Sequence, residues 1–216
     1  MDAVIIRQLG IAPYSVTFDQ MRHFTLTRTE DTPDEIWFVE HPPVFTLGKS
    51  ANRSNILDAG NIPTIKTDRG GDVTYHGPGQ AVVYLLWDLV RRFGRLRVRE
   101  LVTQIEEAVL EVLSEHQIKG ERHAGTPGIY IPARQGAKIA ALGLKVNHKG
   151  YSYHGFALNV AMDLAPFTQI NPCGYPGLTV TDMKTLGASC QVVDIQSALV
   201  KALASKIGFS VKGTLP

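Results

Sequence analysis

The stretch AKIAALGLKVNHKGYSYHGFALNV, residues 137–160, decides the expected fold. It holds two apolar runs, 137–146 and 151–160, and the polar connection NHKG between them ends in a glycine. Two such runs with a short polar link predict a β-hairpin. The first run is apolar on both of its faces, so we expect this strand to be covered on both sides.

Two ionisable side chains interrupt this hairpin. By strict strand alternation, Lys138 shares a face with Ala140 and Leu142, and His154 shares a face with Phe156. A lysine here either reaches water at the rim of the sheet, which is the commoner case, or is buried. If it is buried, desolvation lowers its pKa, and it can act as a base or stabilise a thiolate. A lone histidine on an apolar face is more often a core residue than a catalyst.

The rest of the chain repeats this β-rich pattern with few helical segments. Further β-like runs lie at 3–9, 35–40, 43–48, 72–76, 80–89 and 128–132. Helical spacing of apolar residues occupies 99–116 and 194–207, with Asp194 as the expected N-cap and Gly208 as the C-cap of the second helix. The pattern predicts one α+β domain over residues 1–216, a mixed sheet backed by helices.

Composition excludes several classes of protein. The 216 residues are 44% hydrophobic and 19% charged, which is typical of a globular protein, and the net charge of +2 does not by itself indicate nucleic-acid binding. No apolar run reaches the roughly 18 residues of a membrane span, and the first residues resemble no signal or transit peptide. Two cysteines make no disulfide framework, so we expect a reducing cytoplasm.

Motifs for bound cofactors and metals are incomplete. VFTLGKS, residues 44–50, ends like a phosphate-binding loop, but Pro43 stands where the first glycine of that motif should fall. The seven histidines do not fall at metal-ligand spacing. We therefore expect neither a metal nor a cofactor.

The segment DRGGDVTYHGPGQ, residues 68–80, is a candidate binding loop. Paired glycines let a backbone approach a ligand closely and leave N–H groups free to point at it. Two tight turns around an edge strand would produce the same pattern. Arg69, Asp72, Tyr75 and His76 in the same short segment favour binding.

A second candidate is the thiol in QINPCGYPGLTV, residues 169–180. Cys173 stands between Pro172 and Gly174 in an irregular loop that offers the sulfur little steric cover. Cys190, by contrast, has small and apolar neighbours and is interpreted as structural. Cys173 is therefore a candidate nucleophile.

Such a nucleophile needs a neighbouring cation. An unperturbed cysteine, with a pKa of about 8.5, is only a few per cent thiolate at pH 7. Lys138, His76 and His154 are the available cations. These residues predict nucleophilic chemistry without specifying the reaction.

Five motifs together are more specific. HPPVFTLGKSA, RGGDVTYHGPGQ, GAKIAALGLKV, HGFALNV and INPCGYPG, in this order, resemble the lipoyl(octanoyl) transferases, also called lipoate–protein ligases B. The resemblance spans nearly the whole chain and is weak only after about residue 185. It implies the α/β catalytic fold shared by biotin–protein and lipoate–protein ligases.

The resemblance also assigns roles to residues. Cys173 would carry the acyl group as a thioester, and Lys138 would lower the pKa of this cysteine and help to deprotonate the incoming amine. His76 and His154 would lie close to the reacting groups. The acyl-binding residues would be Arg69, Gly70, Gly71, Asp72, Val73, Thr74, Tyr75, His76, Ala141, Leu142, Gly143, Gly155, Phe156 and Ala157.

The implied reaction moves an octanoyl or lipoyl group from acyl carrier protein to a lysine of a lipoyl domain. The implied acceptors are the lipoyl domains of 2-oxoacid dehydrogenase E2 subunits and the glycine cleavage H protein. Backbone N–H groups near Gly174 or in 141–143 are candidate donors to the oxyanion. The alternatives are an ATP-dependent lipoate or biotin ligase, which would not need Cys173, a cysteine thioesterase, and a module that only binds carrier domains.

A basic segment is a candidate docking site for such carriers. RRFGRLRVRE, residues 91–100, places five arginines before the first long helix. Most charge runs are simply solvated, but acyl carrier proteins and many lipoyl domains are acidic. Reversal of Arg92 and Arg95 to glutamate is then expected to slow acylation.

Overall fold

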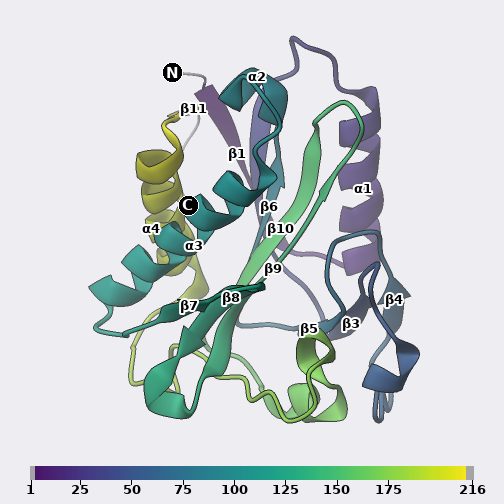
Figure 1. Cartoon of the computed structure of the whole chain (residues 1–216), viewed down its shortest axis with the longest axis vertical. Coiled ribbons are helices and arrows are strands. Elements are labelled where there is room, and N and C mark those ends of the chain that lie inside the picture. Colours follow the sequence, from purple (N-terminus) through teal and green to yellow (C-terminus); the bar gives the residue numbers. More distant parts are fainter. Residues whose placement is uncertain (1–2, 213–216) are drawn as a thin grey trace.

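A mixed eight-stranded sheet forms the centre of the computed structural model, which describes residues 3–212 (Figure 1). Its strands, in spatial order, are β11 (Ser210–Lys212), β1 (Ala3–Ile11), β2 (Asp34–Glu40), β6 (Gln80–Leu86), β10 (Ser152–Asn159), β9 (Ala137–Val146), β8 (Thr126–Ile131) and β7 (Glu121–His123). β1 pairs in parallel with β11 and β2, and the other pairs are antiparallel. The predicted hairpin is the pair β9–β10. Because the sheet contains both parallel and antiparallel pairs, the predicted mixed sheet is confirmed.

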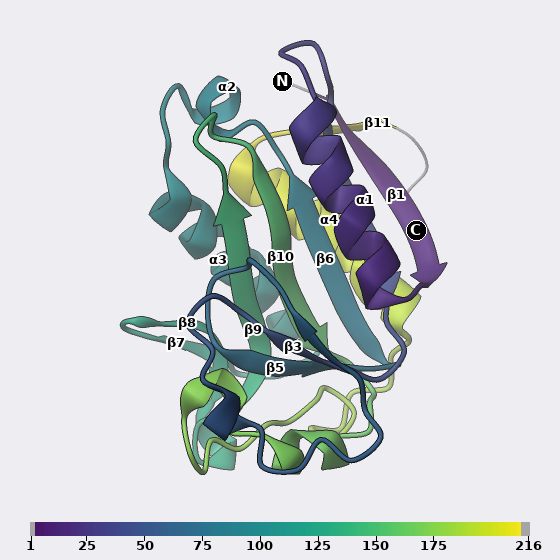
Figure 2. The ribbon, with the colours of Figure 1, turned by 90° about the vertical axis from the view of Figure 1, so that its right-hand side faces the viewer.

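Helices cover both faces of this sheet (Figure 2). α3 (Val98–Glu115) and α4 (Val192–Ile207) pack side by side on one face, where Leu101 and Leu203 join the main core. α1 (Tyr14–Thr27) lies on the other face. Among residues 3–212, no helix combines the length and the apolar composition that crossing a membrane requires.

The helix at 194–207 was predicted, but its cap was wrong. Gln191 is the N-cap, and Asp194 is the third residue of the helix, where its carboxylate accepts the Gln191 N–H at 3.3 Å. The two side chains form a reciprocal capping box, which starts the helix earlier than a simple aspartate cap would. Gly208 is the C-cap as predicted, with a left-handed φ of 79°.

α1 was not predicted, because its buried face is partly polar. The buried residues are Tyr14, Thr17, Met21 and Thr25, which recur at helical spacing. The Thr17 and Thr25 hydroxyls donate to the carbonyl oxygens of Pro13 and Met21, at 3.1 and 2.8 Å. These bonds remove the cost of burying the hydroxyls, so threonine takes positions where an apolar residue is the usual signal.

A small second sheet covers the lower end of β9 and β10 on the α1 face (Figure 2). Its strands are β4 (Thr64–Lys66), β3 (Val44–Leu47) and β5 (Val73–His76), with β3 in the middle. The Gly70 N–H donates to the Leu144 carbonyl oxygen at 2.9 Å, which ties the loop before β5 to β9. The short turns η1 (Arg53–Asn55), η2 (Pro132–Arg134), η3 (Ala165–Gln169) and η4 (Pro172–Gly174) complete the fold.

Strict alternation fails at both ionisable residues of the hairpin. Ile129 of β8 pairs with Ala140, but Tyr130 pairs with Lys138, so Ile139 is an extra residue in β9. This bulge places both Ile139 and Ala140 in the core and sends Lys138 to the opposite face. The predicted shared face of Lys138 and Ala140 is therefore wrong.

His154 leaves its predicted face for a different reason. Its φ of 58° is left-handed, so its ring stacks on Phe18 of α1, at 5.2 Å between centroids. Phe156, two residues on, belongs to the core on the α3 and α4 face. The left-handed backbone therefore separates the two side chains that alternation predicts to lie together.

The arginine segment is partly structural. The buried carboxylate of Asp34 pairs with Arg28, Arg91 and Arg92 at 2.8, 2.9 and 2.7 Å, and the Arg92 side chain is only 4% exposed. Arg92 also lies 4.7 Å from the Trp87 ring centroid. Removing one partner of a buried ion pair typically costs about 3–5 kcal/mol, so reversal of Arg92 would test folding rather than docking.

The position of this segment also argues against docking there. Arg91 and Arg92 belong to α2 (Leu89–Phe93), which lies at the opposite end of the molecule from β5 in both views (Figures 1 and 2). Arg95 and Arg99 remain exposed. A docking role for these two stays a prediction, tested by Arg95→Glu alone.

Candidate active site

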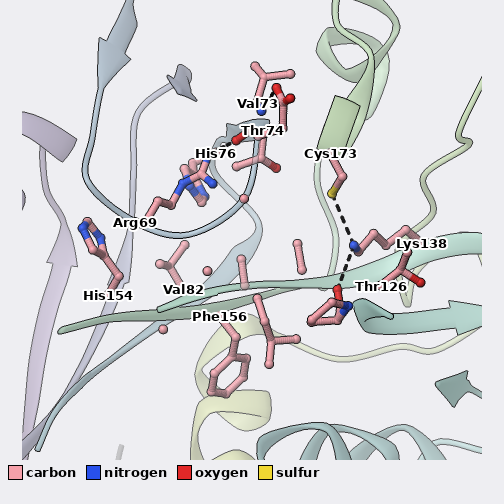
Figure 3. Close-up of a pocket in the computed structure, with 18 of the residues that line it drawn as sticks. Arg69, Val73, Thr74, His76, Val82, Thr126, Lys138, His154, Phe156 and Cys173 are labelled. Atoms are coloured by element: carbon pink, nitrogen blue, oxygen red, sulfur yellow. Dashed lines mark hydrogen bonds between the residues drawn. The ribbon is translucent and has the colours of Figure 1, made fainter. Parts of the chain in front are cut away.

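An elongated cavity of about 180 Å³ lies between the two sheets (Figure 3). β6, β9 and β10 form one wall, and the loop before β5 with β5 itself forms the other. Of the predicted acyl-binding residues, the cavity is lined by Arg69, Gly71, Asp72, Val73, Thr74, His76, Ala141, Leu142, Gly143, Gly155, Phe156 and Ala157. Three chain segments that are distant in sequence therefore meet in one slot.

Two predicted residues do not line the slot. The Gly70 N–H is used in the contact with β9, and Tyr75 points into a separate apolar cluster with Phe45 and Phe167. Alternation along β5 explains the second case, since Thr74 and His76 face the cavity and Tyr75 faces away. A role of Gly70 and Tyr75 in acyl binding therefore stays a prediction that the lining of this cavity does not support.

Other lining residues escaped sequence reasoning. They are Tyr14, Val82, Tyr84, Gly125, Thr126, Pro127 and Tyr175. Val82 and Tyr84 alternate along the predicted strand 80–89, so the pattern shows that they share a face but not which face meets a cavity. Tyr14 comes from the unpredicted helix α1, and no signal in its sequence marks it.

Cys173 and Lys138 meet at one end of the slot (Figure 3). The Lys138 Nζ lies 3.3 Å from the Cys173 Sγ and donates to the Pro127 carbonyl oxygen at 3.0 Å. The same Nζ lies 5.1 Å from the Tyr130 ring centroid. Burial by itself lowers the pKa of Lys138, but Cys173 and Tyr130 outweigh it, and the net pKa is raised. Lys138 therefore stays an ammonium beside the free thiol.

The backbone at Cys173 is held in an uncommon conformation. Its φ is 58°, and that of Gly174 is 78°. The turn is fixed by Asn171, whose N–H donates to the Asn55 carbonyl oxygen at 2.8 Å. The left-handed φ of Gly174 disfavours any residue with a side chain, and a Cβ there would also stand 2.8 Å from an Asp72 carboxylate oxygen. Strained backbone of this kind is concentrated at functional sites.

One predicted oxyanion donor is already occupied. The Gly174 N–H donates to the Asn171 carbonyl oxygen at 2.9 Å, closing the η4 turn. It is therefore not free to bind an oxyanion in this conformation.

Arg69 braces the wall of the slot. Its guanidinium donates to the carbonyl oxygens of Thr46 and Asp72, both at 2.7 Å, and to that of Gly70 at 3.0 Å. Burial lowers its pKa from the usual value. These backbone contacts hold the glycine-rich loop against β3, and this explains why an arginine stands among the glycines.

His154 lies at the end of the slot away from Cys173 (Figure 3). Its Nε2 lies 3.0 Å from a carboxylate oxygen of Asp68, and Tyr153 donates to the other oxygen of this carboxylate. Burial outweighs this contact and lowers the pKa of His154. His154 thus lines the same cavity as Cys173 but at its other end, and its role near the reacting groups stays a prediction. Asp68 is a partner that the sequence did not reveal.

His76 also cannot supply the cation. Burial lowers its pKa to about 3, and it lowers that of the neighbouring His41 to about 4. The His76 Nδ1 contacts the Gln80 side chain at 2.7 Å, and the His41 Nε2 contacts the Tyr84 hydroxyl at 2.7 Å. Of the three cations proposed from sequence, Lys138 is the one that meets the thiol.

These buried histidines predict sensitivity to acid. In the unfolded chain both histidines gain a proton near pH 6.5. In the folded chain His41 has a pKa of about 4 and His76 a pKa of about 3, so both stay neutral to lower pH. The stabilisation from the two neutral histidines is therefore fully present above pH 6.5. Below this pH the free energy of unfolding falls, and each histidine contributes up to about 1.4 kcal/mol per pH unit to the fall. Urea unfolding at pH 7.5, 5.5 and 4.5 measures this slope. His76→Gln should flatten it, and equal slopes in both proteins would contradict the assignment.

The site has the parts required for nucleophilic acyl transfer. A thiol stands beside a buried ammonium, and an apolar slot leads away from the sulfur. A family model described as the lipoyl protein ligase A/B catalytic domain matches residues 13–204. The chain therefore belongs to the lipoyl protein ligase A/B catalytic domain family.

Curated relatives narrow this class. An octanoyltransferase of Herminiimonas arsenicoxydans is 54% identical, over 92% of this chain and 94% of the relative. An octanoyltransferase of Burkholderia pseudomallei strain K96243 is 52% identical, over 99% of this chain and 95% of the relative. Within its family the chain is thus an acyltransferase of the octanoyltransferase group, which confirms the resemblance seen in the sequence.

Solved structures agree with the fold. A lipoate–protein ligase A crystallised with ATP superposes with a TM-score of 0.80 at 13% identity, over 99% of this chain and 89% of that one. A biotin protein ligase from Aquifex aeolicus gives 0.55 at 10% identity, over 95% and 68%. The predicted ligase-like fold is confirmed, and at these identities the likeness speaks for the fold alone.

Proposed function

We propose that this protein transfers an octanoyl group from acyl carrier protein to a lysine of a lipoyl domain through a thioester on Cys173. The acceptors would be the lipoyl domains of 2-oxoacid dehydrogenase E2 subunits and the glycine cleavage H protein, and the free thiol suits a reducing cytoplasm. The observation that carries the proposal is the 3.3 Å contact between the Lys138 ammonium and the Cys173 sulfur at the end of an apolar slot.

In the first step, Cys173 takes the acyl group. The Cys173 sulfur, 3.3 Å from the Lys138 Nζ, attacks the carbonyl carbon of the donor thioester as a thiolate, the nucleophilic form of a thiol. A new carbon–sulfur bond forms to Cys173 while the donor's carbon–sulfur bond breaks. The departing thiolate takes a proton from the Lys138 ammonium, so Lys138 becomes neutral as the donor leaves.

In the second step, Lys138 changes from acid to base. The Cys173 thiolate is a main cause of the raised pKa of Lys138, and forming the thioester removes this negative charge. Burial, which lowers the pKa, then acts with less opposition, and Lys138 can remain neutral. The acceptor amine attacks the thioester and passes a proton to Lys138. This step makes the amide and restores the thiolate–ammonium pair.

The slot suits an unbranched aliphatic chain. Small residues, among them Ala141, Gly143, Gly155 and Ala157, leave a narrow passage along β9 and β10. A Cβ at Gly155 would come within 2.0 Å of the Val83 carbonyl oxygen, so this strand position must be glycine. Each buried CH₂ stabilises the bound chain by about 0.8 kcal/mol, so the depth of the slot can select chain length.

The proposed reaction needs no ATP, because exchange between two thioesters is nearly balanced and transfer to an amine is downhill. The test is octanoyl transfer from octanoyl-acyl carrier protein to a lipoyl domain, followed by gel shift or mass, with and without ATP. We expect equal transfer in both cases. Transfer that occurs only with free octanoate and ATP would favour the ligase, and free octanoate without acceptor labelling would favour the thioesterase.

A further inference from the structure

A second cavity of about 340 Å³ opens beside the acyl slot. It is lined by His123, Thr126, Tyr130, Tyr175, Pro176, Gly177 and Leu178. These residues come from the β7–β8 hairpin on one side and from the segment that follows η4 on the other. None of the roles assigned so far uses this cavity.

The two cavities meet beside the reacting pair. Both are lined by Thr126 and Tyr175. Tyr175 follows the nucleophile by two residues, and Tyr130 forms the wall of the second cavity while its ring stands 5.1 Å from the Lys138 Nζ. The Cys173–Lys138 pair therefore lies between two passages rather than at a blind end.

The chemistry requires two passages. A thioester carbonyl carries two substituents, the acyl chain and the sulfur with its arm. When the chain lies in the slot and the carbonyl carbon lies at the Cys173 sulfur, the arm must leave by another path. We propose that the second cavity binds the pantetheine arm of the acyl donor, an inference that rests on the proposed function.

The walls of the cavity suit a slender, amide-bearing arm. The His123 and Tyr130 rings stack at 4.1 Å with an interplanar angle of 4°, and both residues line the cavity. The opposite wall is a tight turn, closed by the Leu178 N–H that donates to the Tyr175 carbonyl oxygen at 3.2 Å. Pro176 and Leu178 offer apolar contacts for the dimethyl carbon of pantetheine, and flat aromatic rings pack well against planar amides.

Tyr175 stands where the arm must pass. Its side chain is 52% exposed although it lines both cavities, whereas Tyr130 opposite is only 3% exposed. Tyr130 is thus buried on one side of the passage, and Tyr175 on the other side borders solvent. A donor attached to a large carrier protein can therefore thread its arm while the carrier stays outside.

The experiment compares two octanoyl thioesters in the first half-reaction. One is octanoyl-pantetheine, and the other is the octanoyl thioester of ethanethiol, which has no arm. The rate of octanoyl addition to Cys173 is followed by intact-protein mass. We expect the wild type to prefer the pantetheine thioester by at least about 10-fold in kcat/KM, because binding energy from the remote arm assists the reaction.

Leu178→Trp fills the cavity, and it should reduce this preference to about twofold or less. His123→Ala, which removes part of one wall, should reduce it to a smaller extent. Leu96→Trp is the matched control, because Leu96 is 55% exposed in the loop after α2, at the other end of the molecule. This control should keep the wild-type preference.

The outcomes separate this inference from the proposed function. A wild type without preference, or equal slowing of both thioesters by Leu178→Trp, would overturn the inference alone. Slowing of only the transfer from Cys173 to the acceptor would assign the cavity to the acceptor lysine and would also overturn it. No octanoyl addition to Cys173 from either thioester or from octanoyl-acyl carrier protein would reject the proposed function, and the inference with it.

Discussion

Replacing Cys173 with alanine is expected to lower kcat/KM for octanoyl transfer by at least about 10³-fold, because the covalent route is lost. The acceptor amine would have to attack the donor thioester directly, without the neighbouring thiolate–ammonium pair. The side chain is small and only partly buried, so the change should leave the fold intact. Initial rates with octanoyl-acyl carrier protein and a lipoyl domain measure the loss.

Cys190→Ala is the matched control for this variant. Cys190 is the other free cysteine, and burial raises its pKa, which keeps it a thiol. Its removal should change the rate by less than about twofold. A Cys173→Ala protein that keeps its rate within about 10-fold of the wild type would contradict the covalent mechanism.

Removal of the Lys138 charge is expected to have the second-largest effect. Lys138→Met keeps the length and the apolar stem of the side chain but removes the ammonium, and it should slow both half-reactions by about 10²–10⁴-fold. Acylation slows because the thiolate loses its cation at 3.3 Å. Transfer to the amine slows because no base accepts the proton. Single-turnover mass measurements resolve the two steps.

Lys138→Arg separates the two roles of this lysine. A guanidinium keeps the positive charge, but its very high pKa prevents it from acting as a base. Compared with Lys138→Met, the Lys138→Arg variant should therefore regain more of the rate of acylation than of the rate of transfer to the acceptor. Equal recovery of both steps would show that Lys138 acts only as a charge, and equal rates for Lys138→Met and the wild type would show that it does neither.

The sequence predicted most of the sheet because long apolar runs and short polar links are local signals. The pair β9–β10 was predicted in this way. The helices α3 and α4 were predicted from another local signal, the helical spacing of apolar residues. The same signal failed for α1, where Thr17 and Thr25 satisfy their own hydroxyls and so replace apolar residues. Local patterns report on solvent exposure, and they miss helices whose polar groups are satisfied internally.

The site was predicted by residue type more reliably than by orientation. The residue types left Lys138, His76 and His154 open as the cation beside Cys173, and the family resemblance implied Lys138. The structure brings the Lys138 Nζ and the Cys173 Sγ together. The faces of Lys138 and His154 were wrong, since the first follows a bulge at Ile139 and the second has a left-handed backbone. Such local irregularities shift a side chain by one face, and no period in the sequence records them.

The structural role of the buried Arg69 could not be predicted from the sequence either. A charge beside four glycines suggests a ligand, but the arginine binds the carbonyl oxygens of Thr46, Gly70 and Asp72 instead. Only the folded loop brings these carbonyl oxygens to one place. The same holds for Asp34, which binds Arg28 and, from a second segment, Arg91 and Arg92.

The mass of the intact protein after mixing with octanoyl-acyl carrier protein tests the central claim most directly. The account predicts one octanoyl adduct on Cys173, absent from Cys173→Ala, that disappears when a lipoyl domain is added and reappears as octanoyl on the acceptor lysine. An acceptor that becomes octanoylated by an enzyme that never carries the group, or that requires ATP and free octanoate, would contradict it.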